Sequence, residues 1–319
     1  MTSTVSTNLQ EQFGSRTRAN LRGILLPFTT PFSSDGSLDL TALQSNIKDW
    51  NTKGISGYVA LGSTGEKAHL DEREYLQVVE TSRSEVPSDL LFIVGVAQNS
   101  TLKAISEIRM AASSGADAVL VLTPHYYRPA MTQQVLVNHY RAVADASPVP
   151  VILYSMPALT GVKIAPDTVA TLNQHENIIG IKDSSNDLEE FTSTVKLCSP
   201  EFAVITGNGT VLYDALLAGA RAAILAVGCV VPELCVEILT AAQNDEHDRA
   251  ITLQQTLTPL ASAVTTNYGI GGLKNALDMN GYKGGVVRAP LRMPDARARE
   301  EIAQLLNEAE AALKIAHVR

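Results

Sequence analysis

Lys182 stands at the end of a short apolar run and is followed by the polar residues 183–185. The run, residues 178–181, shows no polar alternation, which predicts a strand buried on both faces. Burial disfavours the charged ammonium form of a lysine, and a neutral amine can attack a carbonyl carbon. A lysine at the end of a strand can also simply extend its amine into solvent. Lys182 therefore predicts Schiff-base chemistry if other reactive residues gather around it.

Hydroxyl groups follow two other apolar runs. Tyr154 ends the run 150–154, and Ser63 and Thr64 lie in the glycine-flanked segment 62–66. A phenol beside an amine can carry protons in imine chemistry. A turn that offers hydroxyl and N–H groups can bind a carboxylate, although a Gly-Ser-Thr-Gly segment is more often only a turn. These residues form a reaction centre only if the fold brings them together.

Eight short apolar runs recur along the chain, each followed by a polar loop and an amphipathic stretch. They are residues 23–28, 57–61, 91–96, 118–122, 150–154, 178–182, 202–206 and 222–227. This repeat predicts a (β/α)₈ TIM barrel, an α/β fold in which residues that follow the strands meet at one face. A doubly wound open sheet is the rival, but it normally has fewer strands and a glycine-rich first turn, which residues 26–31 do not provide.

The chain is expected to have three parts: a flexible N-terminal tail over residues 1–21, the barrel over 22–244 and a C-terminal helical extension over 245–319. Helices are predicted over residues 232–244, 250–265 and 294–317. The tail is polar and lacks the apolar core of a secretory signal. We expect a cytoplasmic protein, and a mitochondrial transit peptide is the alternative because Arg16, Arg18 and Arg22 accompany a single acid, Glu11.

Composition excludes several function classes. Hydrophobic residues make up 45% of the 319 residues, charged residues make up 18%, and the net charge is −8. A negative chain without a Lys/Arg cluster is not expected to bind nucleic acid. No apolar stretch reaches the roughly 18 residues of a membrane span. Cys198, Cys229 and Cys235 lack metal-ligand spacing and are expected to pack as small hydrophobes. A small molecule is therefore the expected partner.

Four motifs, in order and with sensible spacing, carry a family resemblance. They are residues 62–66, the pair Tyr126-Tyr127, residues 153–157 with 160–161, and residues 180–183. They resemble the signatures of the dihydrodipicolinate synthase/N-acetylneuraminate lyase superfamily, from about residue 22 to about residue 291. The resemblance implies a class I, pyruvate-handling aldolase on a (β/α)₈ barrel, usually assembled as a homotetramer that is a dimer of dimers.

The resemblance also implies roles for eight residues. The catalytic residues are Lys182 as the Schiff-base lysine, Tyr154 as the proton-relay tyrosine, Ser63 as the relay hydroxyl and Tyr127 as the tyrosine contributed across the dimer interface. The substrate-binding residues are Thr64 for the carboxylate, Ser184 as a hydroxyl beside the lysine, and Gly207 and Ile224 as backbone groups that line the pyruvate pocket. Neither a metal ion nor an organic cofactor is implied.

One position separates the members of the superfamily. The synthases carry an arginine after strand five that binds a substrate carboxylate, and the matching residue here is Leu159, which cannot make that bidentate contact. The tail motifs, residues 268–274, 281–282 and 288–291, look closest to 4-hydroxy-2-oxoglutarate aldolases, although those enzymes typically carry Asn at the position of Thr64. The expected activity is cleavage of a 4-hydroxy-2-oxoacid, such as 4-hydroxy-2-oxoglutarate, to pyruvate and an aldehyde.

Three alternatives remain at this point. Leu159 suits a 2-keto-3-deoxy sugar-acid aldolase equally well, and a dihydrodipicolinate synthase-like protein is another member of the same superfamily. A pyruvate-binding regulatory barrel without turnover is the non-enzymatic alternative. The presence of Lys182, Tyr154 and Ser63 together argues against a barrel that has lost its chemistry.

Overall fold

The computed structural model describes residues 17–316, and its centre is a closed parallel barrel. The strands are β1 (Gly23–Leu26), β2 (Gly57–Ala60), β3 (Leu91–Val96), β4 (Ala118–Leu122), β5 (Val151–Ser155), β6 (Ile178–Asp183), β7 (Ala203–Thr206) and β8 (Ala222–Ile224). They pair in chain order, and β8 closes the barrel onto β1. The (β/α)₈ prediction is confirmed, and each predicted run overlaps one strand, with β5 and β6 extending one residue beyond their runs.

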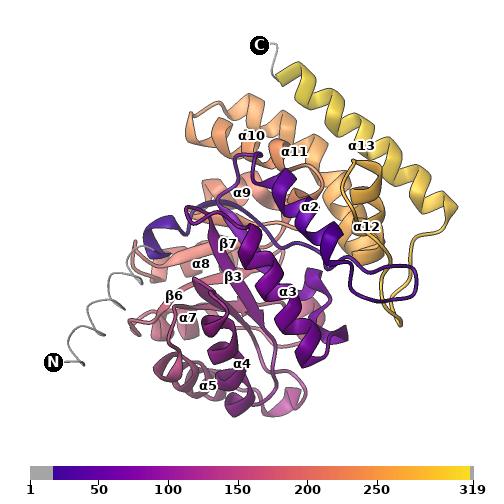
Figure 1. The fold of residues 1–319 in the computed structure, drawn as a ribbon. Helices are drawn as coiled ribbons and strands as arrows, with labels where there is room; N and C mark the ends of the chain where they lie inside the picture. Colours follow the sequence, from indigo (N-terminus) through magenta and orange to yellow (C-terminus); the bar gives the residue numbers. More distant parts are fainter. Residues whose placement is uncertain (1–16, 317–319) are drawn as a thin grey trace.

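Helices follow the strands and cover the outside of the barrel (Figure 1). They are α2 (Leu40–Trp50), α3 (Glu72–Glu85), α4 (Thr101–Ser113), α5 (Gln133–Ala146), α6 (Pro157–Thr160), α7 (Pro166–Leu172), α8 (Leu188–Leu197), α9 (Leu212–Leu217) and α10 (Pro232–Gln243). Beyond them lie α11 (His247–Ser262), a π-helical turn (Ala263–Asn267), α12 (Gly269–Met279) and α13 (Ala296–Ala316). Residues 1–16 of the predicted tail, and residue 317 at the end of the predicted last helix, lie outside the described residues.

Helix α12 is the longest helix that the sequence did not predict. Three of its first four residues, Gly269, Gly271 and Gly272, have poor helix propensity, so the local pattern does not indicate a helix. Close packing explains two of these glycines. A Cβ on Gly271 would lie 2.1 Å from the Arg292 carbonyl oxygen, and one on Gly272 would lie 2.5 Å from the Tyr268 Cβ. Tertiary packing therefore decides the conformation of this segment.

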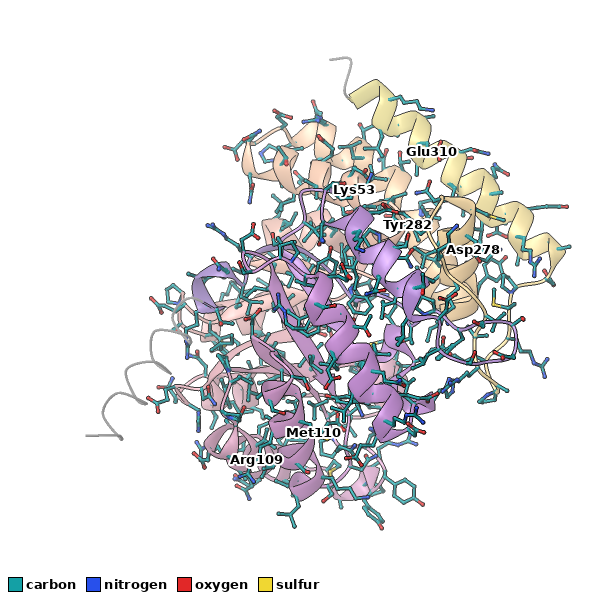
Figure 2. The ribbon with its side chains drawn as sticks, viewed as in Figure 1. Lys53, Arg109, Met110, Asp278, Tyr282 and Glu310 are labelled. Atoms are coloured by element: carbon teal, nitrogen blue, oxygen red, sulfur yellow. The ribbon has the colours of Figure 1, made fainter. Side chains whose placement is uncertain are left out.

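The C-terminal extension shares the core of the barrel. Ile302 and Leu306 of α13 belong to the same buried cluster as the side chains between the strands and their helices. Figure 1 shows α13, in yellow, lying along α11 and α12. Tyr282, labelled in Figure 2, packs on Trp50 of α2 with ring centroids 5.4 Å apart. A second cluster, made of side chains such as Val59 and Ile152, fills the barrel interior.

The three cysteines are free thiols, and Cys229 and Cys235 are fully buried, as expected for small hydrophobes. No helix within residues 17–316 is long and apolar enough to cross a bilayer.

His139 of α5 gives the folded state a predicted pH dependence. Its Nδ1 lies 2.9 Å from the Thr101 hydroxyl, and its Nε2 is buried without a hydrogen-bond partner. Burial lowers the pKa of His139 from 6.5 to about 4. Above pH 6.5 both the folded and the unfolded chain carry the neutral ring. As the pH falls from 6.5 to about 4, only the unfolded chain takes up the proton, so unfolding becomes easier.

We expect the wild type to lose stability over this window relative to His139→Gln, which does not titrate. The difference in free energy of unfolding should begin to change near pH 6.5 and approach a slope of about 1.4 kcal/mol per pH unit below about pH 6. Urea unfolding of both proteins at pH 7, 6 and 5, at one protein concentration, measures it. Parallel curves over that range would show that the ring binds its proton equally well in the folded and the unfolded chain, which would contradict the prediction.

Candidate active site

Lys182 and Tyr154 face each other on neighbouring strands. They are paired residues in the parallel β5–β6 ladder, one residue before each strand ends. The Lys182 Nζ lies 4.5 Å from the centroid of the Tyr154 ring, and both residues are only 5% exposed. Among the described residues, Lys182 has no carboxylate within ion-pair distance. The amine therefore lies inside the barrel mouth against a phenol, as the sequence predicted.

The loop after β2 brings Ser63 to the same phenol. The Ser63 Oγ lies 3.5 Å from the Tyr154 hydroxyl, a long contact of the kind that often tightens when substrate binds. Ser63 and Thr64 begin a short 3₁₀ turn, Ser63–Gly65, whose own hydrogen bonds use the N–H groups of Gly65 and Glu66. The structure thus brings Lys182, Tyr154 and Ser63 together, with Thr64 on the same turn.

Ser184, just past the end of β6, and Gly207, just past the end of β7, lie beside the lysine. A Cβ on Gly207 would lie 2.8 Å from the Lys182 Cε and 2.0 Å from the Ser184 Oγ, so only glycine fits at this position. The Gly207 N–H donates to the Asp183 carbonyl at 2.6 Å, which continues the β6–β7 pairing past the strand end. Ile224 ends β8 and is fully buried in the cluster that fills the barrel interior. All three therefore line the same end or the interior of the barrel.

A cavity of about 400 Å³ opens at the barrel mouth beside the phenol of Tyr154, and Lys182 is not among the residues that line it. Its walls include Ser63 and Tyr154 at the reaction centre and Asn99, His125 and Leu159 farther out. Leu159 lies on the short helix α6 and is 64% exposed. Leu159, which occupies the position that separates the superfamily members, therefore borders the candidate substrate cavity.

Tyr127 is the one predicted catalytic residue that does not reach this site within the chain. Tyr126 and Tyr127 pack edge to face, with ring centroids 5.0 Å apart, and are 75% and 67% exposed. Two adjacent aromatic rings with this much exposed surface suit an interface with another subunit.

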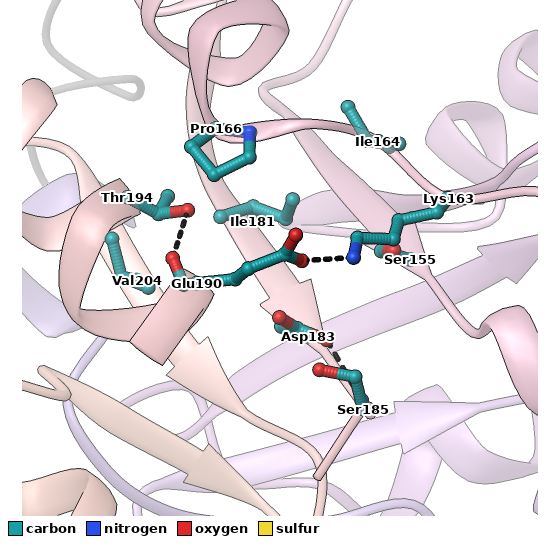
Figure 3. A pocket seen from close by; sticks show the side chains of 10 residues that line it. All are labelled: Ser155, Lys163, Ile164, Pro166, Ile181, Asp183, Ser185, Glu190, Thr194 and Val204. Carbon is teal, nitrogen blue, oxygen red and sulfur yellow. Dashed lines mark hydrogen bonds and ion pairs between the residues drawn. The ribbon is translucent and has the colours of Figure 1, made fainter. Parts of the chain in front are cut away.

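A smaller cavity lies between β6, which contributes Ile181 and Asp183, and helix α8, which contributes Glu190 (Figure 3). Asp183 projects into it and accepts a hydrogen bond from the Ser185 N–H at 2.8 Å, while Lys163 pairs with Glu190 across it. Burial raises the pKa of the Asp183 carboxyl. Because Asp183 faces away from Tyr154, it shapes the segment after the lysine and does not contact the mouth cavity.

Sequence reasoning missed a charged cluster beside the Ser63 turn. The Lys274 Nζ lies 2.5 Å from the Glu66 Oε1, and both side chains have 0% exposure. Burial lowers the pKa of Lys274, against the nearby Glu66 carboxylate, which raises it. Glu66 and Lys274 both lie inside motifs that carried the resemblance, but residues 208 positions apart in sequence give no local signal that they pair. Within residues 17–316, no three His, Cys, Asp or Glu side chains come together as metal ligands.

Comparison with known proteins agrees with this geometry. The profile of the Dihydrodipicolinate synthetase family matches residues 20–309. The chain belongs to this family. Family members of this kind are pyruvate-dependent enzymes of the aldolase type, and the family resemblance of the four motifs is confirmed.

Named relatives agree with the assignment to this family. The chain is 37% identical over 273 residues to the 4-hydroxy-tetrahydrodipicolinate synthase of Methanothrix thermoacetophila, which covers 85% of this chain and 90% of that protein. It is 34% identical over 288 residues to the enzyme of the same name from Methanosphaerula palustris, covering 89% of this chain and 98% of that one.

Two crystal structures show the same fold. Dihydrodipicolinate synthase DapA-2 from Bacillus anthracis aligns with a TM-score of 0.86 and 28% identity over 90% of this chain and 98% of that chain. YagE from E. coli K12, a member of the dihydrodipicolinic acid synthase family solved in complex with pyruvate, aligns with a TM-score of 0.84 and 29% identity over 91% of this chain and 99% of that chain. Both named relatives carry the synthase name, and both crystal structures belong to the same family.

Proposed function

We propose that this protein is a class I aldolase that cleaves a 4-hydroxy-2-oxoacid, such as 4-hydroxy-2-oxoglutarate, to pyruvate and an aldehyde through a Schiff base on Lys182. The observation that carries the proposal is the Lys182 amine, 5% exposed and 4.5 Å from the Tyr154 ring centroid. An amine held in a buried site beside a phenol is placed to attack a carbonyl carbon, with a proton carrier next to it.

The reaction begins with attack of the Lys182 Nζ on the C2 carbonyl carbon. Loss of water from the resulting carbinolamine gives an iminium ion, which accepts electrons from the adjacent C3–C4 bond. Tyr154 takes the proton of the C4 hydroxyl, the C3–C4 bond breaks, and the C4 fragment leaves as an aldehyde. The enamine that remains is protonated at C3, and water hydrolyses the imine to release pyruvate and the free lysine.

The other site residues support these steps. Ser63, 3.5 Å from the Tyr154 hydroxyl, can pass the proton onward, and Tyr127 of another subunit would extend the relay. Thr64 would bind the carboxylate of pyruvate, and Ser184 would contact the substrate beside the imine. With 4-hydroxy-2-oxoglutarate the aldehyde product would be glyoxylate. We also propose that the enzyme works in the cytoplasm as a homotetramer, without a metal ion or an organic cofactor.

A 2-keto-3-deoxy sugar-acid aldolase is the second candidate. The cavity of about 400 Å³ supports it, because Asn99, His125 and Thr160 border the outer part and can hydrogen-bond to hydroxyl groups. Both candidates share the chemistry at Lys182 and differ only in the aldehyde that is released.

Pyruvate release from a panel of substrates tests the proposal. The panel contains 4-hydroxy-2-oxoglutarate and 2-keto-3-deoxy sugar acids of five and six carbons. The condensation of pyruvate with aspartate semialdehyde is measured separately, by the consumption of pyruvate. We expect the 4-hydroxy-2-oxoacid to have the highest kcat/KM. Pyruvate trapping without turnover of any member would indicate a binding protein and contradict the proposal.

Tyr154→Phe is expected to lower kcat by roughly 10²-fold, the size of a lost general acid/base. The ring still packs against Lys182, so the change removes only the hydroxyl that Ser63 contacts. The thermal midpoint should stay close to that of the wild type, which controls for the fold. A kcat near the wild-type value would remove Tyr154 from the mechanism.

Tyr127 is expected to act in the site of a neighbouring subunit. Mixing inactive Tyr127→Phe subunits with inactive Lys182→Ala subunits should restore some activity, because hybrid assemblies contain sites with both groups intact. Tyr126→Phe is tested in parallel, since the structure exposes both rings. Subunit exchange is verified by mass. No rescue by either tyrosine variant after exchange would show that the relay does not cross an interface.

A further inference from the structure

The turn that carries Ser63 and Thr64 is held between two residues in left-handed backbone conformations. Leu61 has φ 54° and Glu66 has φ 53°, and neither is glycine. Side chains other than those of Gly, Asn and Asp rarely adopt this conformation, and it persists where surrounding contacts enforce it. The turn is therefore a strained segment at the reaction centre, and the contacts at its two ends must hold it.

The contacts at the first end come from the barrel. Gly95 of β3 lets the chain approach closely, because a Cβ there would lie 2.4 Å from the Leu61 carbonyl oxygen. From the loop after β1, the buried Thr30 hydroxyl donates to the Gly65 carbonyl at 2.7 Å. These contacts fix Leu61 and the middle of the turn but leave the conformation of Glu66 to other groups.

The contacts at the second end come from the C-terminal extension. Glu66 pairs through Oε1 with Lys274 of α12, and its Oε2 accepts the backbone N–H of Arg288 at 3.1 Å. His69 Nδ1 lies 3.1 Å from the same Oε2. The Lys274 Nζ also donates to the Val286 carbonyl at 2.6 Å and lies 4.4 Å from the centroid of the Phe32 ring.

The groups that hold Glu66 are themselves firmly placed. The Arg288 guanidinium donates to Glu74 at 2.6 Å, to the His69 carbonyl at 2.7 Å and to the Gly36 carbonyl at 2.9 Å. A Cβ on Gly284 would lie 2.0 Å from the Lys274 carbonyl oxygen, so the loop after α12 packs directly on the lysine. The extension therefore presents Lys274 and the Arg288 N–H to Glu66 at a fixed position.

Stability alone is a weak explanation for this arrangement. A buried ion pair often contributes no more than apolar residues of the same volume would, because both charges must give up water. A pair of this kind does restrict its partners to one geometry. That restriction matters here because Glu66 follows Gly65 directly, three residues after the hydroxyl that contacts Tyr154.

We propose that Glu66 and Lys274 are positioning residues through which the C-terminal extension holds the Ser63–Thr64 turn in its catalytic geometry. The inference rests on the proposed aldolase function, and it gives a role to the tail motifs that contain Lys274 and Arg288. Neither residue contacts the reacting atoms; both act through the backbone of the turn.

Lys274→Met tests the proposal, because Met fills the space without the charge while His69 and the Arg288 N–H remain to bind Glu66. The double variant Glu66→Gln, Lys274→Met removes both charges and leaves no unpaired ion, so it decides the question if the single variant does not fold. Arg83→Met is the matched control. Arg83 pairs with Asp117 at 3.4 Å, and Asp117 precedes β4 at the opposite end of the barrel from the site.

The measured quantity is kcat per subunit that can form an imine with pyruvate. Borohydride with saturating pyruvate counts the subunits that form an imine, and kcat is divided by that number, so unfolded protein does not contribute. We expect kcat per trappable subunit to fall about tenfold or more in the Lys274 variants, since small displacements of catalytic groups have effects of this size. The pyruvate concentration that half-saturates trapping should rise as well, because Thr64 lies on the same turn.

Arg83→Met should lower the thermal midpoint and keep the wild-type kcat per trappable subunit. If the folded Lys274 variant, or the double variant in its place, matched Arg83→Met in both kinetic values, the ion pair would be only structural and the proposal would be wrong. Absence of a wild-type adduct on Lys182 would be a different result, which would overturn the proposed function itself.

Discussion

Lys182→Ala is expected to abolish the trapping of pyruvate by borohydride and to lower turnover by at least about 10³-fold. The amine supplies the covalent bond that makes the substrate an electron sink, and no other group in the site can replace that bond. The side chain is buried without a carboxylate partner among the described residues, and Gly207 leaves the space that its Cε occupies. Removing it should leave the strand pairing of β6 unchanged.

Peptide mapping of the wild-type adduct by mass gives the position of the imine. Two other lysines near the mouth serve as internal controls. Lys274 is fully buried against Glu66, and the Lys67 Nζ lies 3.0 Å from the Glu107 Oε2 in a pair whose side chains are 12% and 6% exposed. Each amine is engaged by a carboxylate and is not directed at the Tyr154 phenol, so neither should form an adduct. An adduct on Lys67 or Lys274, or trapping that survives in Lys182→Ala, would remove Lys182 from its role.

The barrel and the place of the reaction centre were predictable because their signals are local. Each strand is a short apolar run, and the residue that follows a barrel strand must lie at the mouth. Tyr154 and Lys182 end neighbouring runs, so their proximity follows from the fold alone. The pairing of these two residues in the β5–β6 ladder agrees with that reasoning.

The direction of the Lys182 side chain was not predictable from the run itself. Ile179 points into the barrel interior, and strict alternation from it would turn Lys182 outward toward the helices. The pairing shifts by one residue, since Val151 is opposite Ile178 whereas Ile152 is opposite Gly180. This bulge adds one residue to β6 and turns Lys182 inward, onto the face of Tyr154. A register shift depends on the neighbouring strand and leaves no mark in a single apolar run.

The contact between the C-terminal extension and the Ser63 turn could not be predicted from the sequence for a related reason. Glu66 and Lys274 lie on distant segments, and each is an unremarkable charged residue in its own segment. Tyr127 presents the opposite case, since its predicted role needs a second subunit and a single chain can show only that the ring is exposed.

Leu159 is expected to make the condensation of pyruvate with aspartate semialdehyde slow relative to aldol cleavage. That condensation uses a cation to hold the second substrate's carboxylate, and a charge-assisted bidentate contact contributes about 1.5–3 kcal/mol. Leu159 offers no such contact at the edge of the cavity. We expect kcat/KM for cleavage of the preferred 4-hydroxy-2-oxoacid to exceed that of condensation by at least about 10²-fold, or about 2.7 kcal/mol of transition-state stabilisation.

Leu159→Arg is the matched variant, because the side chain is exposed on the short helix α6 and can be replaced without disturbing the core. It should raise the rate of condensation relative to that of cleavage. The fraction of subunits that borohydride traps with pyruvate should stay the same. Efficient condensation by the wild type would instead mean that another residue supplies the positive charge. Arg128 would then be the residue to change, because a Cβ on Gly161 would lie 2.8 Å from its Nη1, which brings its guanidinium to the loop that carries Leu159. In that case the 37% identity to a named synthase would extend to the substrate, and the assignment to the cleaving aldolases would be wrong.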